Sequence, residues 1–187
     1  MTTLTAPAPT VSGVSAVSVV PGVSRPVRWA AKAAALTLLP SGLWRVLIAV
    51  GIPVGWGAGD ALHSDNFPGI GSLYLIALST FAECLGLLTL GLVQRWGEEV
   101  PRWIPRLGGR RIPPLVAVVP AALGAAAVTA ITVLSAFAWN ANFTQSPTAP
   151  SGAAYWFMTL CYAPLLLWGP LLAFVTAAYW RRRALRG

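Results

Sequence analysis

The chain has 187 residues, of which 56% are hydrophobic and only 10% are charged, and its net charge is +8. Soluble domains contain about 25% charged residues, so this composition excludes an ordinary soluble domain. A strong positive charge often indicates nucleic-acid binding, but here the basic residues stand in short clusters beside apolar stretches, and no soluble module remains to bind nucleic acid. We therefore expect an integral membrane protein with no nucleic-acid partner.

The N-terminal part of the chain is first uncharged and then basic. Residues 1–24 consist mostly of Pro, Ser, Thr, Ala and Val, and they lack the basic residues that open a secretory signal. We predict a disordered cytoplasmic tail over residues 1–24. Residues 27–39 follow with Arg28, Trp29 and Lys32, a composition typical of a helix at the level of the lipid headgroups. They predict a short N-terminal interfacial helix.

Four long apolar stretches are candidate membrane spans. Pro40 interrupts the interfacial helix, and Ser41 can cap a new helix directly after it. The predicted spans cover about residues 41–56, 73–93, 115–139 and 153–180. The alternative at the N-terminal side is one long, bent helix over residues 27–56. The fold class we expect is an all-α membrane protein with four transmembrane helices and a short N-terminal interfacial helix, in one domain over residues 25–180.

The third predicted span is the richest in small residues. Its first half contains Ala121, Ala122, Gly124, Ala125 and Ala126. Small residues let helices approach closely in lipid, where packing replaces the hydrophobic driving force. We therefore expect this span to be the most central of the four.

The basic residues predict the orientation of the spans. All thirteen Lys and Arg residues fall in the N-terminal flank up to Arg45, in residues 94–114, or in a basic C-terminal tail over residues 181–187. The two other connections contain none, and positive charge marks the cytoplasmic side. Arg greatly outnumbers Lys, which is typical of a GC-rich bacterial genome. We expect a multi-pass protein of the bacterial plasma membrane, with both termini cytoplasmic and its basic clusters against anionic lipid.

Two sequence runs carry a family resemblance, LLPSGLWR at residues 38–45 and QRWGEEVPRWIPRLGGRRIPP at residues 94–114. They resemble runs in a family of small, uncharacterised four-helix integral membrane proteins of actinobacteria. The resemblance covers most of residues 36–180 and implies a four-span inner-membrane fold. It implies no activity.

The candidate functional site centres on Glu83, near the middle of the second predicted span. An ionised carboxylate there is costly, so we expect Glu83 to be protonated, paired or facing a wet cavity. Ser79 and Thr80 lie one turn away on the same helix face, and Arg45 is the one basic residue near enough to pair with it. Two interpretations stay open. Glu83 is a proton-titrating or substrate-binding carboxyl, or it holds the bundle through a hydrogen bond or an ion pair with Arg45.

Other chemistry-bearing residues give weaker signals. Asp60, His63 and Asp65 lie in a glycine-rich connection and suggest a divalent-metal cluster, but solvated loop residues explain them equally well, and we expect no metal. Cys84 and Cys161 lie inside predicted spans and should remain free thiols. The sequence contains no nucleophile–base pair, phosphate-binding loop or paired catalytic carboxylates, so we expect neither an enzyme nor a cofactor.

The function we expect is that of a structural or accessory component of a membrane complex, formed with a membrane-protein partner or as a homo-oligomer. The alternative is a small proton-coupled transporter that uses Glu83. Four spans and one membrane carboxyl resemble the small multidrug exporters, but those proteins are shorter and carry the carboxyl in the first span.

Reporter fusions test the predicted orientation. Fusions within residues 57–72 or 140–152 should report the outside of the cell, and fusions within residues 94–114 or at either terminus should report the cytoplasm. A cytoplasmic signal from residues 57–72 would contradict this orientation, because every later span would then be inverted.

Overall fold

A computed structural model describes residues 20, 22–99, 109 and 111–185, and all the regular elements within them are helices. The main helices are α1 Arg25–Leu36, α2 Leu39–Ala49, α3 Ile70–Gly91, α4 Pro114–Thr144, α5 Gly152–Tyr162 and α6 Leu165–Ala184, and the short 3₁₀ helices are η1 Ser64–Asn66 and η2 Arg95–Gly97. Four helical stretches are long and apolar enough to cross a membrane: Arg25–Ala49, Ile70–Gly91, Pro114–Ala141 and Gly152–Ala184. These stretches confirm the all-α, four-span fold class. The predicted tail over residues 1–24 falls almost wholly outside the described residues.

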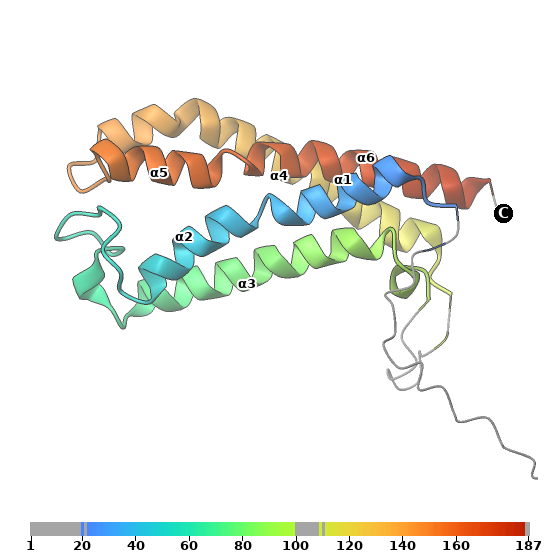
Figure 1. The fold of residues 1–187 in the computed structure, drawn as a ribbon, viewed down its shortest axis with the longest axis horizontal. Coiled ribbons are helices and arrows are strands. Elements are labelled where there is room, and N and C mark those ends of the chain that lie inside the picture. The colour runs from blue at the N-terminus through green and yellow to red at the C-terminus, as the bar shows by residue number, and fades with distance from the viewer. Residues whose placement is uncertain (1–19, 21, 100–108, 110, 186–187) are drawn as a thin grey trace, which may run out of the picture.

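The first span consists of two helices in line, α1 and α2 (Figure 1). The break between them precedes Pro40, which stands in the first turn of α2, where a missing N–H is harmless. We expected α1 to lie at the headgroups, but the structure continues it into the span. The reason is a face of small apolar residues, Val27, Ala31 and Ala34, which is buried against the neighbouring helices while the cations of α1 stay outside.

Glycine and proline explain where the helices depart from the predicted spans. Helix α2 ends at Ala49 because Gly51 takes a left-handed conformation with φ +78° and turns the chain away. The fourth span consists of α5 and α6, and Pro164 stands at the junction because it cannot donate a helical hydrogen bond.

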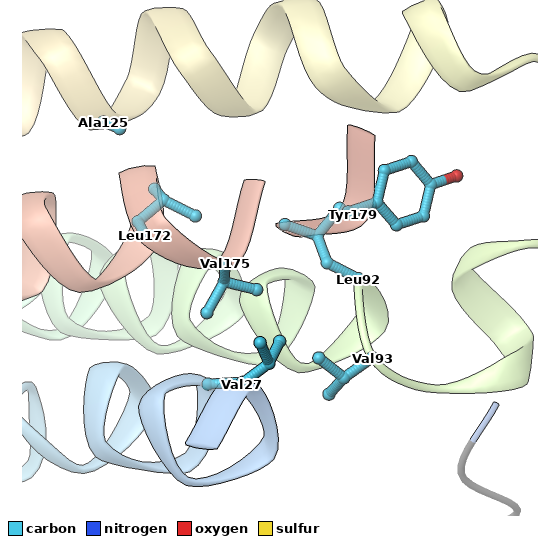
Figure 2. Packing of buried hydrophobic residues seen from close by; sticks show 8 residues of the cluster. Val27, Leu92, Val93, Ala125, Leu172, Val175 and Tyr179 are labelled. Atoms are coloured by element: carbon cyan, nitrogen blue, oxygen red, sulfur yellow. The ribbon is translucent and has the colours of Figure 1, made fainter. Parts of the chain in front are cut away.

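The spans are arranged around the α1–α2 pair. Helix α3 packs along one side of this pair and α5–α6 along the other, while α4 packs on α6 (Figure 1). At one end of the bundle α1 begins and α3 and α6 end. This end carries every described Lys and Arg except Arg45, and we call it the basic end. Figure 2 shows the apolar cluster there, built from Val27, Leu92, Val93, Ala125, Leu172, Val175 and Tyr179.

The expectation that the third span is central was wrong. Only 6% of the residues in the apolar part of α4 are buried, against 50% in the first span. The small residues of α4 serve one close contact with α6, since a Cβ added at Gly169 would overlap Oγ1 of Thr129. This contact uses one side of α4, and most other residues of the helix are exposed or half-buried.

The connections at the opposite end of the bundle are tied together by polar contacts. The Gly57 N–H donates to the Thr148 carbonyl at 2.7 Å, and Thr148 Oγ1 donates to Asp60 Oδ2 at 3.0 Å. These bonds join the connection after α2 to the connection after α4. They hold α2 and α5 together at the point where α2 ends and α5 begins.

At the basic end, side chains of α6 bind the end of α3 and the connection between α3 and α4, and we call these contacts the clamp. Arg182 Nη2 donates to Glu98 Oε1 at 2.7 Å and to the Leu92 carbonyl at 3.2 Å, and both charged side chains are mostly buried, at 10% and 14% exposure. Arg183 Nη2 donates to the Ile112 carbonyl at 2.8 Å. The predicted basic tail therefore begins inside α6, whose last turn docks on the connection between α3 and α4.

Replacing Arg182 by Gln should lower the free energy of unfolding by about 1–3 kcal/mol, because it removes a charged hydrogen bond from a mostly buried site. The matched control is Arg181→Gln, an exposed position on the same turn, with an expected loss within about 0.5 kcal/mol. Denaturant unfolding of the detergent-solubilised protein measures both. Equal losses in the two variants would contradict the clamp.

Candidate functional site

The candidate site lies where α2 packs against α3, well inside the membrane-spanning part of the bundle. Helix α3 places Ser79 and Glu83 one turn apart, and α2 places Gly42 and Arg45 one turn apart. Ser79 meets Arg45, and Glu83 meets Gly42. The interface therefore has two polar levels, one helical turn apart.

Arg45 is sealed between three helices. It is only 6% exposed, and its Nε donates to Oγ of Ser79, itself 7% exposed, at 2.9 Å. Its guanidinium carbon lies 6.0 Å from the centre of the Tyr162 ring on α5, within cation–π range. The buried Nη2 has no hydrogen-bond partner among the described residues. Arg45 of α2 thus contacts both α3 and α5, and its Nη2 group donates no hydrogen bond to a described residue.

Arginine stays charged under all conditions in proteins, so this group cannot escape its environment by losing a proton. An unpaired charge in hydrocarbon is costly, and each partner that Arg45 finds lowers that cost. Ser79 and Tyr162 are these partners. The position of Arg45 therefore constrains how α2, α3 and α5 pack together.

Glu83 occupies the second level and is half-buried. Its Oε1 lies close to α2, where a Cβ added at Gly42 would stand 3.0 Å from it. Among the described residues the one Arg–carboxylate ion pair is Arg182–Glu98, so Glu83 and Arg45 are not paired in this structure. The carboxyl is turned toward a neighbouring helix, and glycine makes the room for it.

A groove of about 850 Å³ runs along the α2–α3 seam at this level. Ser79, Thr80 and Glu83 line it, together with Cys84 and with Cys161 from α5. Its walls are otherwise apolar. Thr80 is exposed and donates to its own helix, to the Ile76 carbonyl at 2.8 Å. The structure thus brings the three predicted α3 residues into one groove and places Arg45 behind it.

The weaker candidates do not converge on one site. The Nε2 atom of His63 lies 3.2 Å from Oδ2 of Asp65. The Asp60 carboxylate has other partners, since it accepts from the Leu62 N–H at 2.8 Å and from the Thr148 hydroxyl. In the part of the chain that the structure describes, no group of three or more His, Cys, Asp or Glu side chains is placed to hold a metal ion.

Sequence reasoning missed two members of the site, Gly42 and Tyr162. Gly42 carried a usable signal, because a glycine three residues before Arg45 leaves space on the same helix face. Tyr162 carried none, since its helix is remote in sequence and only tertiary packing brings it to Arg45.

Ser79→Ala should lower the free energy of unfolding by about 1–3 kcal/mol, because it leaves the Arg45 Nε buried without an acceptor. Thr80→Ala is the matched control, since it removes an exposed hydroxyl from the same helix and should cost less than about 0.5 kcal/mol. Denaturant titrations of both variants in detergent give the comparison. A Thr80 variant as unstable as the Ser79 variant would refute the proposed bond.

Comparison with known proteins finds no matching family model, no matching curated protein and no matching solved structure. The resemblance to actinobacterial four-helix proteins therefore stays a prediction from two sequence runs.

Proposed function

We propose that this protein is an accessory subunit of a bacterial inner-membrane complex and that it binds a transmembrane helix of a partner membrane protein. The observation that carries the proposal is a shallow furrow of about 670 Å³ between the exposed sides of α4 and α6. Its walls include Ala122, Ala126 and Ala130 of α4 and Ala173, Thr176 and Ala177 of α6. We call this surface the alanine furrow.

The alanine furrow suits a helix better than it suits lipid. Lipid tails are as apolar as leucine, so helices associate in membranes through close packing at small residues. Ala122, Ala126 and Ala130 repeat every four residues and form one continuous strip along α4. A partner helix on this strip would approach the α4 backbone closely, a contact that mobile acyl chains do not make as well.

The proposal involves no catalysis. The polar groups described above make contacts within the bundle, Arg45 with Ser79 and Asp60 with Thr148. The alanine furrow itself is lined by apolar side chains apart from Thr129 and Thr176. In the proposed orientation the basic end lies in the cytoplasm.

Filling the alanine furrow should break the complex while leaving the fold intact. Ala126→Trp places a bulky ring in the furrow, and Ala127→Trp places the same ring on an adjacent exposed position outside it. A photo-crosslinker at residue 126 in native membranes should capture one defined membrane protein, and a crosslinker at residue 127 should not. Association with that protein should be lost in Ala126→Trp only.

Two results would contradict the proposal that the alanine furrow binds a helix of a partner protein. Capture of a second copy of this chain at residue 126 would replace the accessory role by self-association. Equal loss of association in the Ala126 and Ala127 variants would show that the furrow is not the contact surface.

A small proton-coupled transporter is the second candidate function, and Glu83 favours it. This carboxyl is half-buried, lines the α2–α3 groove and lies one turn from Arg45 without pairing with it. In this function Glu83 would bind and release the coupled proton. Intramembrane carboxyls often serve proton relays.

Glu83→Gln separates the two functions. In an accessory subunit the amide keeps a donor and an acceptor of similar shape, so the free energy of unfolding should change by no more than about 0.6 kcal/mol, and partner association should persist. A transporter would keep its fold and lose proton flux, measured with a pH-sensitive dye inside proteoliposomes. Glu99→Gln, the same change at an exposed carboxyl outside the groove, is the control for flux, and flux abolished by Glu83→Gln alone would favour transport over the accessory role.

A further inference from the structure

A small cavity of about 260 Å³ lies at the basic end, between the start of α1 and the end of α3. Three cations of α1 line it: Arg25, Arg28 and Lys32. Its remaining walls combine the exposed indole of Trp29 with the apolar side chain of Leu90 and with Val93 and Gln94, which lie just beyond the end of α3. None of the described residues that line this cavity carries a carboxylate.

Among the described residues, the positive charge of this cavity has no acidic partner. None of its three cations forms an ion pair with a described residue, and of the chain's five acidic residues only Glu98 and Glu99 belong to the basic end. Glu98 is already held by Arg182. The first turn of α1 contains no acid, and cations at the positive end of a helix dipole are unfavourable. An anion in the cavity would relieve both problems.

The donors around the cavity match a phosphate group. Arg25 and Arg28 offer forked guanidinium donors, which suit phosphate oxygens, and Lys32 adds a point charge held over the Trp29 ring at 5.2 Å. The amide oxygen of Gln94 already accepts from the Trp96 indole N–H, so its NH₂ group is left to donate.

The apolar surroundings of the cavity indicate that the phosphate belongs to a lipid. Leu90 lines the cavity, and Leu87, one turn further along α3, lines the α2–α3 groove. Across the seam, Leu39 and Leu43 of α2 are exposed and line the same groove. An apolar track therefore leads from the cations into the membrane, and Trp29 is a residue typical of the headgroup level.

We propose that this cavity binds one anionic phospholipid, with its phosphate between Arg25, Arg28 and Lys32 and an acyl chain along the α2–α3 seam. The site is independent of the alanine furrow, which lies on α4 and α6. A basic surface attracts anionic lipid without fixing its position, whereas this cavity would hold one lipid at a defined site beside α1.

The test uses the full chain in nanodiscs of phosphatidylcholine with a small fraction of phosphatidylglycerol. Native mass spectrometry of the released wild-type protein should show one retained phosphatidylglycerol in preference to phosphatidylcholine. Inorganic phosphate at equal concentration should not displace it. Displacement by inorganic phosphate would overturn the lipid assignment in favour of a free-anion site, and retention of both lipids in proportion to their supply would overturn the site itself.

The variant R25Q/R28Q/K32Q should reduce retention of phosphatidylglycerol about tenfold, because it removes the charged hydrogen bonds that hold the lipid phosphate in the cavity. The matched control R95Q/R111Q/R181Q removes the same charge from exposed positions of the basic end that do not line the cavity. Equal reductions in the two variants would show diffuse attraction without a site. The wild-type competition decides the question if the first variant does not fold.

Discussion

Arg45 carries a charge that it cannot lose, in the part of the chain that hydrocarbon surrounds, and the packing of the bundle follows from that constraint. Its hydrogen bond to Ser79 fixes α2 against α3, and its place beside the Tyr162 ring fixes α5 against both. Because α5 continues into α6 and α6 packs on α4, these contacts connect Arg45 to every span. Gly42 and Glu83 then occupy the adjacent turn, where the helices have room for a carboxyl.

The two ends of the bundle are closed by different interactions, and this difference shapes the surface. Backbone and hydroxyl contacts around Thr148 join the connections at one end, whereas Arg182 and Glu98 form a buried clamp at the other. With its polar groups engaged inside, the protein presents two distinctive surfaces to the membrane. These are the alanine furrow on α4 and α6, and the cation-lined cavity on α1. The proposed binding of a partner helix at the furrow and of an anionic lipid at the cavity involves different helices, so one subunit has room for both.

Hydropathy was sufficient to predict the four spans, because length and apolar composition are properties of each segment alone. It was not sufficient to place the segments relative to one another. The alanines of α4 predicted a central helix, yet α4 is covered mainly on the side where Ala125 is buried and Thr129 meets Gly169 of α6. The cations of α1 predicted an interfacial helix, yet its opposite face of Val27, Ala31 and Ala34 packs into the bundle. The pairing of Arg45 with Ser79 was within reach of sequence reasoning, which had named both residues. Its contact with Tyr162 depends on α5, and no local pattern encodes that contact.

The hydrogen bond between Arg45 and Ser79 is the central claim, and a double-mutant cycle measures it most directly. Arg45→Met, Ser79→Ala and the double variant would be unfolded in the same detergent, and the coupling energy calculated from the three losses of stability. Interhelical hydrogen bonds in membranes average about 0.6 kcal/mol, and a charged donor should raise the coupling to about 1 kcal/mol or more. A coupling energy near zero, with the two single losses simply adding, would contradict the account.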